Sequence, residues 1–365
     1  MTRESILKIS PITEWNVYKQ RPLVIAGPCS AESEAQVMQT AAELVSTGRV
    51  DMFRAGIWKP RSRPGTFEGV GIEGLKWLKK VKETYSLPVA VEVANEKHVY
   101  EALKHGVDAL WIGARTTVNP FALQEIASAM GGADVTVFVK NPVSPDLDLW
   151  TGAIERIIKA DIKRIAAVHR GFSSWEESAY RNQPRWHIPL ELRRRLPGLP
   201  LICDPSHMGG DTAFIADLSQ KAMDLNYDGL MIEAHNNPKE ALSDRKQQVT
   251  PAELTTILGH LVMRSVTTDD PKFLDTIEEL RNQIDSYDNM LLDILESRML
   301  VAETIGRYKK EHNITILQSS RWQEILSNAV EKGEKRGLSE EFIETILEAI
   351  HQESIIHQMK VMKEK

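Results

Sequence analysis

The sequence predicts a (β/α)8 TIM barrel followed by an all-α domain of three helices. Two observations predict the barrel: short apolar runs alternate with amphipathic segments up to about residue 262, and a charged or metal-binding residue follows each run. Parallel strands need helical crossovers, and barrel enzymes gather their active sites at the carboxyl ends of their strands. A third observation predicts the helical domain, because residues 272–365 show helical spacing and no strand pattern.

The predicted strands are short, strongly apolar runs, as expected for a parallel sheet buried on both faces. They are Leu23–Ala26, Met52–Phe53, Val89–Val91, Ala109–Ile112, Val135–Val139, Ile165–Val168, Leu199–Cys203 and Leu230–Ile232. The crossovers between them include the amphipathic segments Glu34–Thr47, Gly74–Thr84, Lys97–His105, Pro120–Ala129 and Leu149–Lys159. We therefore expect the barrel to span residues 1–262, followed by a linker at 263–271.

The second predicted domain, residues 272–365, contains one long helix and two shorter ones. Lys272–Glu311 runs for about 40 residues with apolar residues at helical spacing, which corresponds to a helix roughly 60 Å long. Ser319–Arg336 and Ser339–Met362 follow, with Ser339 as an N-cap. Because two short helices cannot cover so long an apolar stripe, we expect a homo-oligomer: a dimer through this domain, with further pairing through the barrels into a tetramer left open.

The composition of the 365 residues is that of an ordinary globular protein, with 42% apolar and 26% charged residues. A net charge of −6 without a basic tract argues against a nucleic-acid partner. No stretch approaches the ~20 apolar residues of a membrane-spanning helix, and the charged amino terminus does not resemble a signal peptide. Two cysteines exclude a disulfide scaffold and lead us to expect a cytoplasmic protein.

Four residues after predicted strands form a candidate metal site. Cys29 follows strand one, His207 follows strand seven, and strand eight is followed by a carboxylate at Glu233 and another on the next loop, Asp244. A thiolate, an imidazole and two carboxylates suit a divalent ion such as Mn²⁺, Fe²⁺, Co²⁺ or Zn²⁺. Taken singly, a small buried cysteine and a helix-capping histidine are the simpler interpretations. Four such residues at one barrel mouth favour the metal.

Six cations also fall on strand ends or on the loops that follow: Arg54, Lys59, Arg61, Arg115, Lys140 and Arg170. Gathered on one face, they would repel each other unless anions neutralise them. Arginine binds phosphate and carboxylate with two parallel hydrogen bonds, while lysine acts as a point charge. We therefore expect a ligand set with more than one anionic group, such as two phosphates and a carboxylate.

Six motifs in register then resemble the type I-beta branch of 3-deoxy-D-arabino-heptulosonate 7-phosphate (DAHP) synthases, from about residue 10 to 262. They are Gly27-Pro28-Cys29-Ser30, Lys59-Pro60-Arg61-Ser62, Gly113-Ala114-Arg115, Lys140-Asn141-Pro142, His169-Arg170-Gly171 and Asp204-Pro205-Ser206-His207. The resemblance implies the condensation of phosphoenolpyruvate with erythrose 4-phosphate to DAHP and phosphate. It departs from the family at Ser62, where threonine is usual, and in Thr116–Asn119.

The resemblance also implies roles for individual residues. The metal ligands would be Cys29, His207, Glu233 and Asp244, with Mn²⁺ as the first choice of ion. Phosphoenolpyruvate would be bound by Arg54, Lys59, Arg115, Lys140 and Arg170, and the sugar phosphate by Arg61 and Ser62. Glu92 and His169 are counted with the substrate-binding residues. Lys140, Glu92 and a metal-bound water remain alternatives for handling the proton of the water that adds during the reaction.

Polar residues recur on the apolar faces of the predicted tail helices: Arg281, Arg298, Lys309, Arg321, Ser354 and Gln358. Arg281 and Arg298 are 17 residues apart, or roughly 25 Å along one helix, so one chain cannot bring them to a common small-molecule site. An antiparallel dimer would pair Arg281 of one chain with Arg298 of the other. On the residues alone, a helical dimerisation module with solvated charges is the simpler interpretation.

The spacing of these residues resembles the AroQ class of chorismate mutases over nearly the whole tail. The resemblance implies the rearrangement of chorismate to prephenate, with the partner's Arg281 and the chain's own Arg298 binding carboxylates. Lys309 and Gln358 would face the ether oxygen, and Arg321 and Ser354 would bind substrate. The chain departs from the family at Gln318 and Trp322, where acidic residues are usual, which makes reduced activity an alternative.

The leading hypothesis is a bifunctional enzyme of aromatic amino acid biosynthesis. Because strand one begins near residue 23, we expect no separate amino-terminal regulatory domain and assign feedback inhibition by chorismate or prephenate to the tail. A second hypothesis makes the tail a non-catalytic regulatory and dimerisation module. A third is a related barrel that condenses phosphoenolpyruvate with another sugar, which the phosphate loop and the tail both disfavour.

Overall fold

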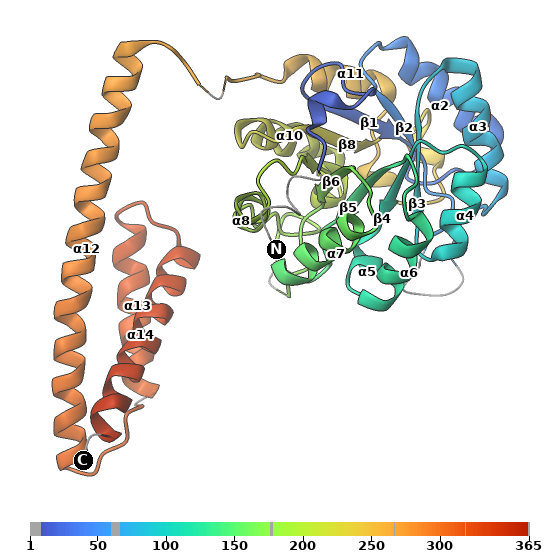
Figure 1. The fold of residues 1–365 in the computed structure, drawn as a ribbon. Helices are drawn as coiled ribbons and strands as arrows, with labels where there is room; N and C mark the ends of the chain where they lie inside the picture. The colour runs from blue at the N-terminus through green and yellow to red at the C-terminus, as the bar shows by residue number, and fades with distance from the viewer. Residues whose placement is uncertain (1–8, 60–65, 176–177, 266, 318, 364–365) are drawn as a thin grey trace. The chain divides into compact units, whose positions relative to one another are not determined.

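The computed structural model describes residues 9–59, 66–175, 178–265, 267–317 and 319–363, with the backbone alone at 319–321. The chain divides into two compact units, Met1–Val266 and Thr267–Lys365, so the division falls inside the predicted linker. Figure 1 shows a barrel and a separate group of helices. Among the described helices, none is both long and apolar enough to cross a membrane.

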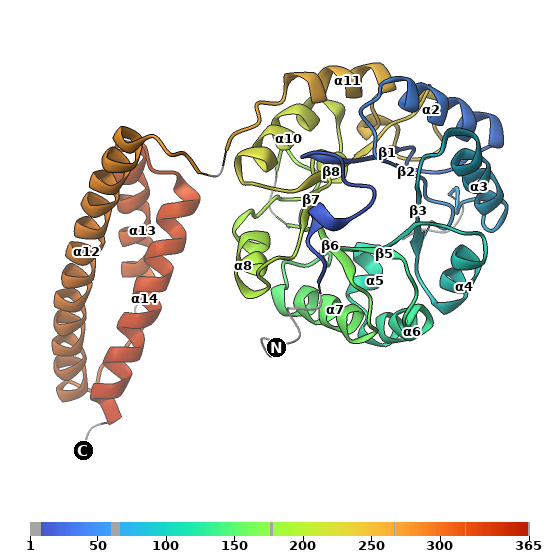
Figure 2. The same cartoon turned by 45° about the horizontal axis from the view of Figure 1, so that its top comes forward.

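The first unit is a closed barrel of eight parallel strands in sequence order, with β8 paired to β1 (Figure 2). The strands are β1 (Leu23–Gly27), β2 (Met52–Arg54), β3 (Val89–Val93), β4 (Ala109–Ile112), β5 (Thr136–Lys140), β6 (Arg164–His169), β7 (Leu201–Cys203) and β8 (Gly229–Glu233). The predicted barrel is confirmed, and each strand end lies within two residues of its predicted position.

Helices surround the barrel, as Figure 2 shows. They are α2 (Glu34–Ser46), α3 (Glu73–Tyr85), α4 (Glu96–Lys104), α6 (Pro120–Met130), α7 (Leu147–Lys159), α8 (His187–Arg195), α10 (Ile215–Asp224) and α11 (Pro251–His260), with the short α5 (Ala114–Thr117) and α9 (Pro205–Gly209) directly after β4 and β7. Side-chain oxygens of Ser33, Asn95 and Asp146 cap α2, α4 and α7 by accepting backbone N–H groups.

The barrel interior is filled by alternate residues of every strand, because neighbouring side chains of a strand point to opposite faces. The interior cluster comprises Leu23, Ile25, Met52, Ala90, Ala109, Trp111, Phe138, Ala166, Val168, Ile202 and Met231, together with Ile12 and Trp15 from the segment before β1. The Trp15 ring contacts Phe138 edge-on, with ring centroids 6.2 Å apart. A second, larger cluster contains the intervening strand residues and the inner faces of the helices.

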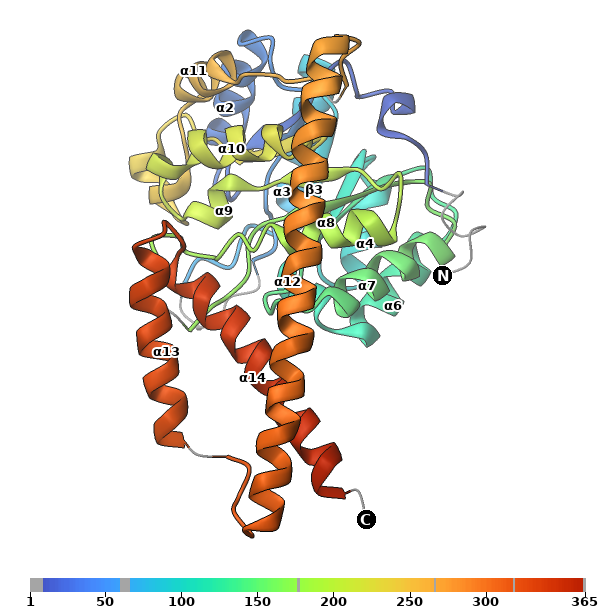
Figure 3. The same cartoon turned by 90° about the vertical axis from the view of Figure 1, so that its left-hand side faces the viewer.

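The second unit consists of α12 (Pro271–Glu311), α13 (Ser319–Glu334) and α14 (Glu340–Lys363). All three lie within two residues of their predicted bounds. In Figure 3, α14 runs beside the carboxyl-terminal part of α12 and meets α13 at a tight turn. Gly306 permits the close approach of α12 to α14, because a Cβ atom there would lie only 3.1 Å from the Cα of Gln358.

The amino-terminal half of α12 extends beyond the other two helices (Figure 1). Of all residues in α12, only Met299, Ala302 and Gly306 are buried. Six large apolar side chains of the amino-terminal half are close to half exposed or more: Phe273, Leu274, Leu280, Ile284, Tyr287 and Leu291. This half of the helix therefore presents an apolar face that the unit itself does not cover.

Candidate active sites

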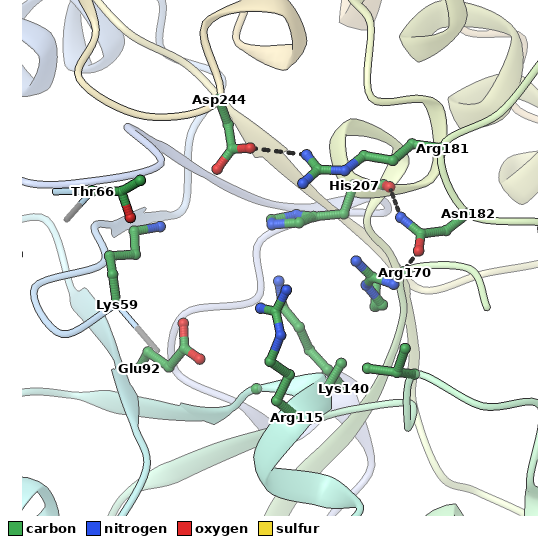
Figure 4. A pocket seen from close by; sticks show the side chains of 13 residues that line it. Lys59, Thr66, Glu92, Arg115, Lys140, Arg170, Arg181, Asn182, His207 and Asp244 are labelled. Carbon is green, nitrogen blue, oxygen red and sulfur yellow. Dashed lines mark hydrogen bonds and ion pairs between the residues drawn. The ribbon is translucent and has the colours of Figure 1, made fainter. Parts of the chain in front are cut away.

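A polar cavity of about 400 Å³ opens among the loops that follow the barrel strands (Figure 4). Seven predicted site residues line it: Lys59, Glu92, Arg115, Lys140, Arg170, His207 and Asp244. Thr66, Arg181 and Asn182 line it as well and were not predicted. Arg61 and Ser62, the predicted sugar-phosphate ligands, lie outside the described residues.

Strand alternation explains why these side chains meet. The inward-facing positions of β2, β3, β5 and β8 are apolar at Met52, Ala90, Phe138 and Met231. Two residues further along, the same inward direction is taken by Arg54, Glu92, Lys140 and Glu233. The barrel interior therefore changes from apolar to charged at the carboxyl ends of its strands.

The four predicted metal ligands come together as two pairs. The Cys29 Sγ lies 3.3 Å from Oδ2 of Asp244, and Nε2 of His207 lies 3.6 Å from Oε1 of Glu233. Within the described residues, no three His, Cys, Asp or Glu side chains are arranged as a closed metal site. The donors still fit a divalent ion, because the fully buried Oε1 of Glu233 has no hydrogen-bond partner among the described residues.

Lys59 and Cys29 are also in direct contact. The Lys59 ammonium group donates to the Cys29 Sγ at 2.9 Å. Burial, reinforced by the Glu233 carboxylate, raises the pKa of the Cys29 thiol to about 12. Since the thiolate is the form that binds metals, occupation of this site by a metal would release the thiol proton.

Asp204 connects the predicted phosphoenolpyruvate site to the predicted metal site. Its buried carboxylate accepts from Nζ of Lys140 at 2.7 Å and lies 2.8 Å from Nδ1 of His207. Burial alone would raise its pKa, but His207 and Lys140 hold the pKa of Asp204 well below its usual range. Asp204 was not predicted as a site residue, although it follows the inward-facing Ile202 by two positions.

Arg54 is not among the residues that line the cavity and is almost fully buried, with 1% of its side chain exposed. One nitrogen, Nη2, lies 3.3 Å from both the Cys29 carbonyl oxygen and Oε1 of Glu233, and the guanidinium stacks over the Trp111 ring at 4.7 Å. Its other two nitrogens, Nε and Nη1, have no hydrogen-bond partner among the described residues. Two buried, unpaired donors on a cation suit an anionic ligand.

Arg170 lies on the side of the cavity opposite Lys59 and Glu92 (Figure 4). Its Nη1 donates to Oδ1 of Asn182 at 2.6 Å, and the Asn182 amide donates to the His207 carbonyl oxygen at 2.6 Å. Burial lowers the pKa of Arg170 to about 10, so the side chain remains charged at neutral pH. Asn182 thus links Arg170, a predicted phosphoenolpyruvate ligand, to the backbone of His207, a predicted metal ligand on α9.

His169 does not line the cavity. Val168 faces the barrel interior, so the next residue of β6 points outward, and His169 packs against Trp186 and Tyr227. Its Nδ1 lies 3.0 Å from the Tyr227 hydroxyl group, and burial lowers the pKa of His169 to about 3. The predicted role of His169 in substrate binding therefore has no direct contact to support it.

Acid should destabilise the barrel through His169. The unfolded chain takes up a proton below about pH 6.5, whereas the folded barrel keeps His169 neutral down to about pH 3. Between these values His169 should lower the free energy of unfolding by up to about 1.4 kcal/mol per pH unit. Urea unfolding of the wild type and His169→Gln from pH 7 to pH 4 would measure this. Equal slopes for the two proteins would contradict it.

In the helical unit, four predicted residues lie on α12 and α14. The Arg298 guanidinium donates to the Ser354 hydroxyl group, which in turn donates to the Ile350 carbonyl oxygen at 2.7 Å. Nζ of Lys309 donates to the Ile316 carbonyl oxygen at 2.5 Å. Gln358 is buried, and its Oε1 has no hydrogen-bond partner among the described residues.

The other two predicted residues of the tail are Arg281 and Arg321. Arg281 is exposed and lies 17 residues before Arg298 on the same helix, a separation of roughly 25 Å. Arg321 falls within α13, but its side chain lies outside the described residues, as does Gln318. A single chain therefore does not bring Arg281 and Arg298 together.

Trp322 packs against α14 by stacking on His351, with ring centroids 4.2 Å apart and planes inclined by 15°. Burial, together with the nearby cations Arg298 and Lys309, lowers the pKa of His351. At Trp322, where the family usually has an acidic residue, this chain therefore has an aromatic ring that stacks on the neutral His351.

Comparison with protein families agrees with this architecture. Residues 14–268 match the model of the DAHP synthetase I family, and residues 280–359 match that of chorismate mutase type II. The first match covers the barrel, and the second covers most of the helical unit.

Individual relatives resemble the barrel part. A phospho-2-dehydro-3-deoxyheptonate aldolase of Thermotoga maritima is 30% identical over 226 residues, or 62% of this chain and 64% of that protein's length. A 2-dehydro-3-deoxyphosphooctonate aldolase of Geobacter sulfurreducens is 30% identical over 66% of this chain and 92% of its own length. The crystal structure of DAHP synthase from Thermotoga maritima superposes with a TM-score of 0.59 at 29% identity, covering 65% of this chain and 67% of that one. The chain therefore belongs to the DAHP synthetase I family, with a carboxyl-terminal segment that matches chorismate mutase type II.

Proposed function

We propose that the barrel condenses phosphoenolpyruvate with erythrose 4-phosphate to DAHP and phosphate, and that the helical unit rearranges chorismate to prephenate. One observation carries the first assignment: in a barrel of the DAHP synthetase I family, the metal-donor side chains His207 and Asp244 line one cavity together with Lys59, Arg115, Lys140 and Arg170. The other two metal donors, Cys29 and Glu233, lie 3.3 Å from Asp244 and 3.6 Å from His207. The match to chorismate mutase type II and the grouping of Arg298, Lys309, Ser354 and Gln358 support the second.

In the barrel, Cys29, His207, Glu233 and Asp244 would hold a divalent ion, with Mn²⁺ as the first choice. When bound, such an ion supplies Lewis-acid polarisation of the aldehyde oxygen of the sugar. Arg54 offers two unpaired buried donors to the phosphoenolpyruvate, and Lys59, Arg115, Lys140 and Arg170 complete its binding site. These cations orient C3 of the enol phosphate toward the aldehyde carbon, which is catalysis by proximity.

A water molecule adds at C2 before phosphate leaves, and its proton needs an acceptor. Lys140 and Glu92 both line the cavity. Lys140 forms an ion pair with the ionised Asp204, which favours a role in holding charge. Glu92 approaches the cavity where Gly113 leaves room, since a Cβ atom at Gly113 would lie 2.1 Å from Oε1 of Glu92. We therefore propose Glu92 as the first candidate for accepting the proton of this water molecule.

In the helical unit, a dimer would complete the site. The rearrangement is unimolecular, so restraint of the substrate and charges placed at the breaking ether bond suffice for catalysis. Arg298 and Arg281 of the partner subunit would bind the two carboxylates of chorismate, with Arg321 and Ser354 assisting. Lys309 and Gln358 would face the ether oxygen. The uncovered apolar half of α12 supports the dimer, because a second copy of α12 would bury it.

A second function for the tail is feedback control of the barrel by bound chorismate or prephenate. Trp322 on the neutral His351 favours this alternative, because it removes a carboxylate that would contact a substrate hydroxyl group. Binding and turnover at one site are compatible, so a regulatory tail can also be a catalyst. We place the protein in the cytoplasm, in keeping with its two free, buried cysteines.

One experiment tests both assignments. The purified protein with Mn²⁺ should consume phosphoenolpyruvate with erythrose 4-phosphate, and much less with arabinose 5-phosphate, and should also convert chorismate to prephenate. A preference for arabinose 5-phosphate would overturn the sugar assignment. If chorismate is not consumed but inhibits the condensation, the tail is a regulator rather than a mutase.

A further inference from the structure

Arg181 lies on the loop between β6 and α8. It contacts the predicted metal ligand Asp244 and also Gln247, which in turn contacts the second predicted carboxylate ligand, Glu233. Its Nη1 donates to Oδ1 of Asp244 at 2.9 Å and to Oε1 of Gln247 at 2.8 Å (Figure 4 shows the first contact). Gln247 is 1% exposed, and its amide nitrogen donates to Oε2 of Glu233 at 2.8 Å. One guanidinium nitrogen therefore reaches Asp244 directly and Glu233 through Gln247.

These hydrogen bonds occupy one oxygen of each carboxylate and leave the other directed at the remaining donors. Oδ2 of Asp244 lies 3.3 Å from the Cys29 Sγ. Oε1 of Glu233 lies 3.6 Å from Nε2 of His207 and 3.3 Å from Nη2 of Arg54. Groups that bond the outer atoms of metal ligands orient them and tune metal affinity. Arg181 and Gln247 stand in that relation to the predicted metal site.

The backbone around these residues needs such support. Asp244 has a φ of 47°, a left-handed conformation that persists in a residue other than glycine only when its surroundings enforce it. Arg181 is itself anchored, because its backbone N–H donates to the Gly209 carbonyl oxygen at 3.2 Å. Its side chain packs on Gly210, where a Cβ atom would lie 2.5 Å from the Cβ of Arg181.

We propose that Arg181 is a positioning residue that, with Gln247, holds Asp244 and Glu233 in the geometry that binds the metal ion. The proposal rests on the metal site of the proposed function and adds to it two residues that are not among the four predicted metal ligands. It also explains why a cation stands beside a site for another cation: its hydrogen bonds order the ligands at the expense of some electrostatic repulsion.

The two roles, charge repulsion and positioning, predict opposite changes in the affinity for Mn²⁺ when Arg181 is removed. If Arg181 acted only through its charge, Arg181→Ala would bind Mn²⁺ more tightly, because one repelling cation is gone. If Arg181 positions the carboxylates, Arg181→Ala should bind Mn²⁺ about 10- to 100-fold more weakly. Arg115→Ala is the matched control, because Arg115 lines the same cavity and no hydrogen bond or ion pair to a predicted metal ligand is described for it.

The test is isothermal titration of chelator-stripped, full-length protein with MnCl₂, with thermal unfolding of each metal-free variant as a check of folding. We expect weaker binding for Arg181→Ala and for Gln247→Met, which keeps the length of the side chain but cannot donate to Glu233. The double variant should lose less than the sum of the two single losses, since both act through one network. Arg181→Lys, which keeps the charge, should recover only part of the affinity.

Two outcomes separate this proposal from the metal site on which it rests. If Arg181→Ala and Gln247→Met bind Mn²⁺ like the wild type while Cys29→Ala does not, the positioning role is wrong and the metal site stands. If Cys29→Ala also binds Mn²⁺ like the wild type, the proposed metal site itself is wrong.

Discussion

The Cys29→Ala variant should lose DAHP formation by about a thousandfold or more while it keeps chorismate mutase activity. Lewis-acid stabilisation by a metal contributes several kcal/mol, and each 1.36 kcal/mol changes the rate tenfold. Cys29 is fully buried and is the only thiolate donor of the predicted set. Steady-state assays of both activities on one preparation would measure the effect.

Cys203→Ala is the matched control for this prediction. Cys203 is equally buried, but it belongs to the cluster between the strands and the helices, and no hydrogen bond or ion pair to the four predicted ligands is described for it. Its loss should leave condensation near the wild-type rate. EDTA should reproduce the defect of Cys29→Ala in the wild type, and Mn²⁺ should reverse it. Undiminished condensation in EDTA would contradict the metal site.

The Arg298→Ala variant should lose chorismate mutase activity by roughly 100- to 1000-fold, because Arg298 would bind a substrate carboxylate and removing one partner of such a charge pair costs about 2–5 kcal/mol. Arg298 is held by Ser354 from the neighbouring helix, so its guanidinium is already oriented before substrate binds. Because the barrel forms a separate compact unit, DAHP formation without added chorismate should be unchanged. Loss of chorismate, followed spectroscopically, measures the effect.

Arg307→Ala provides the control on the same helix, since Arg307 is exposed and pairs only loosely with Glu303 at 3.8 Å. It should retain full mutase activity. Chorismate loss that persists in Arg298→Ala at the wild-type rate would show that the helical unit works through other residues, or that it does not catalyse the reaction.

The barrel was predictable because its strands carry a strong apolar signal. The continuous runs of β1 and β4, for example, are buried at every residue. Helix α8 was not predicted, because its buried face rests on little more than Ile188 and Leu192, and three arginines end it. Short helices of this kind depend on tertiary packing more than on their own pattern.

The candidate site was only partly predictable. A stricter use of strand alternation would have found Asp204 two positions after Ile202 and would have turned His169 away from the cavity. Arg181 and Asn182 lie on the irregular loop between β6 and α8, where no periodic pattern relates sequence position to direction. Only the folded loop shows that these two side chains return to the strand ends.

The interior of the barrel, apolar near Trp15 and charged at the opposite end, has a consequence for protein engineering. Residues of the apolar level, such as Phe138 and Met231, can be exchanged to tune thermal tolerance without altering what the catalyst recognises. Residues two steps further along β2, β3, β5 and β8 must instead be kept, because Arg54, Glu92, Lys140 and Glu233 are the residues proposed for phosphoenolpyruvate, the proton and the metal. Directed evolution of this scaffold can therefore vary the apolar level while the charged level stays fixed.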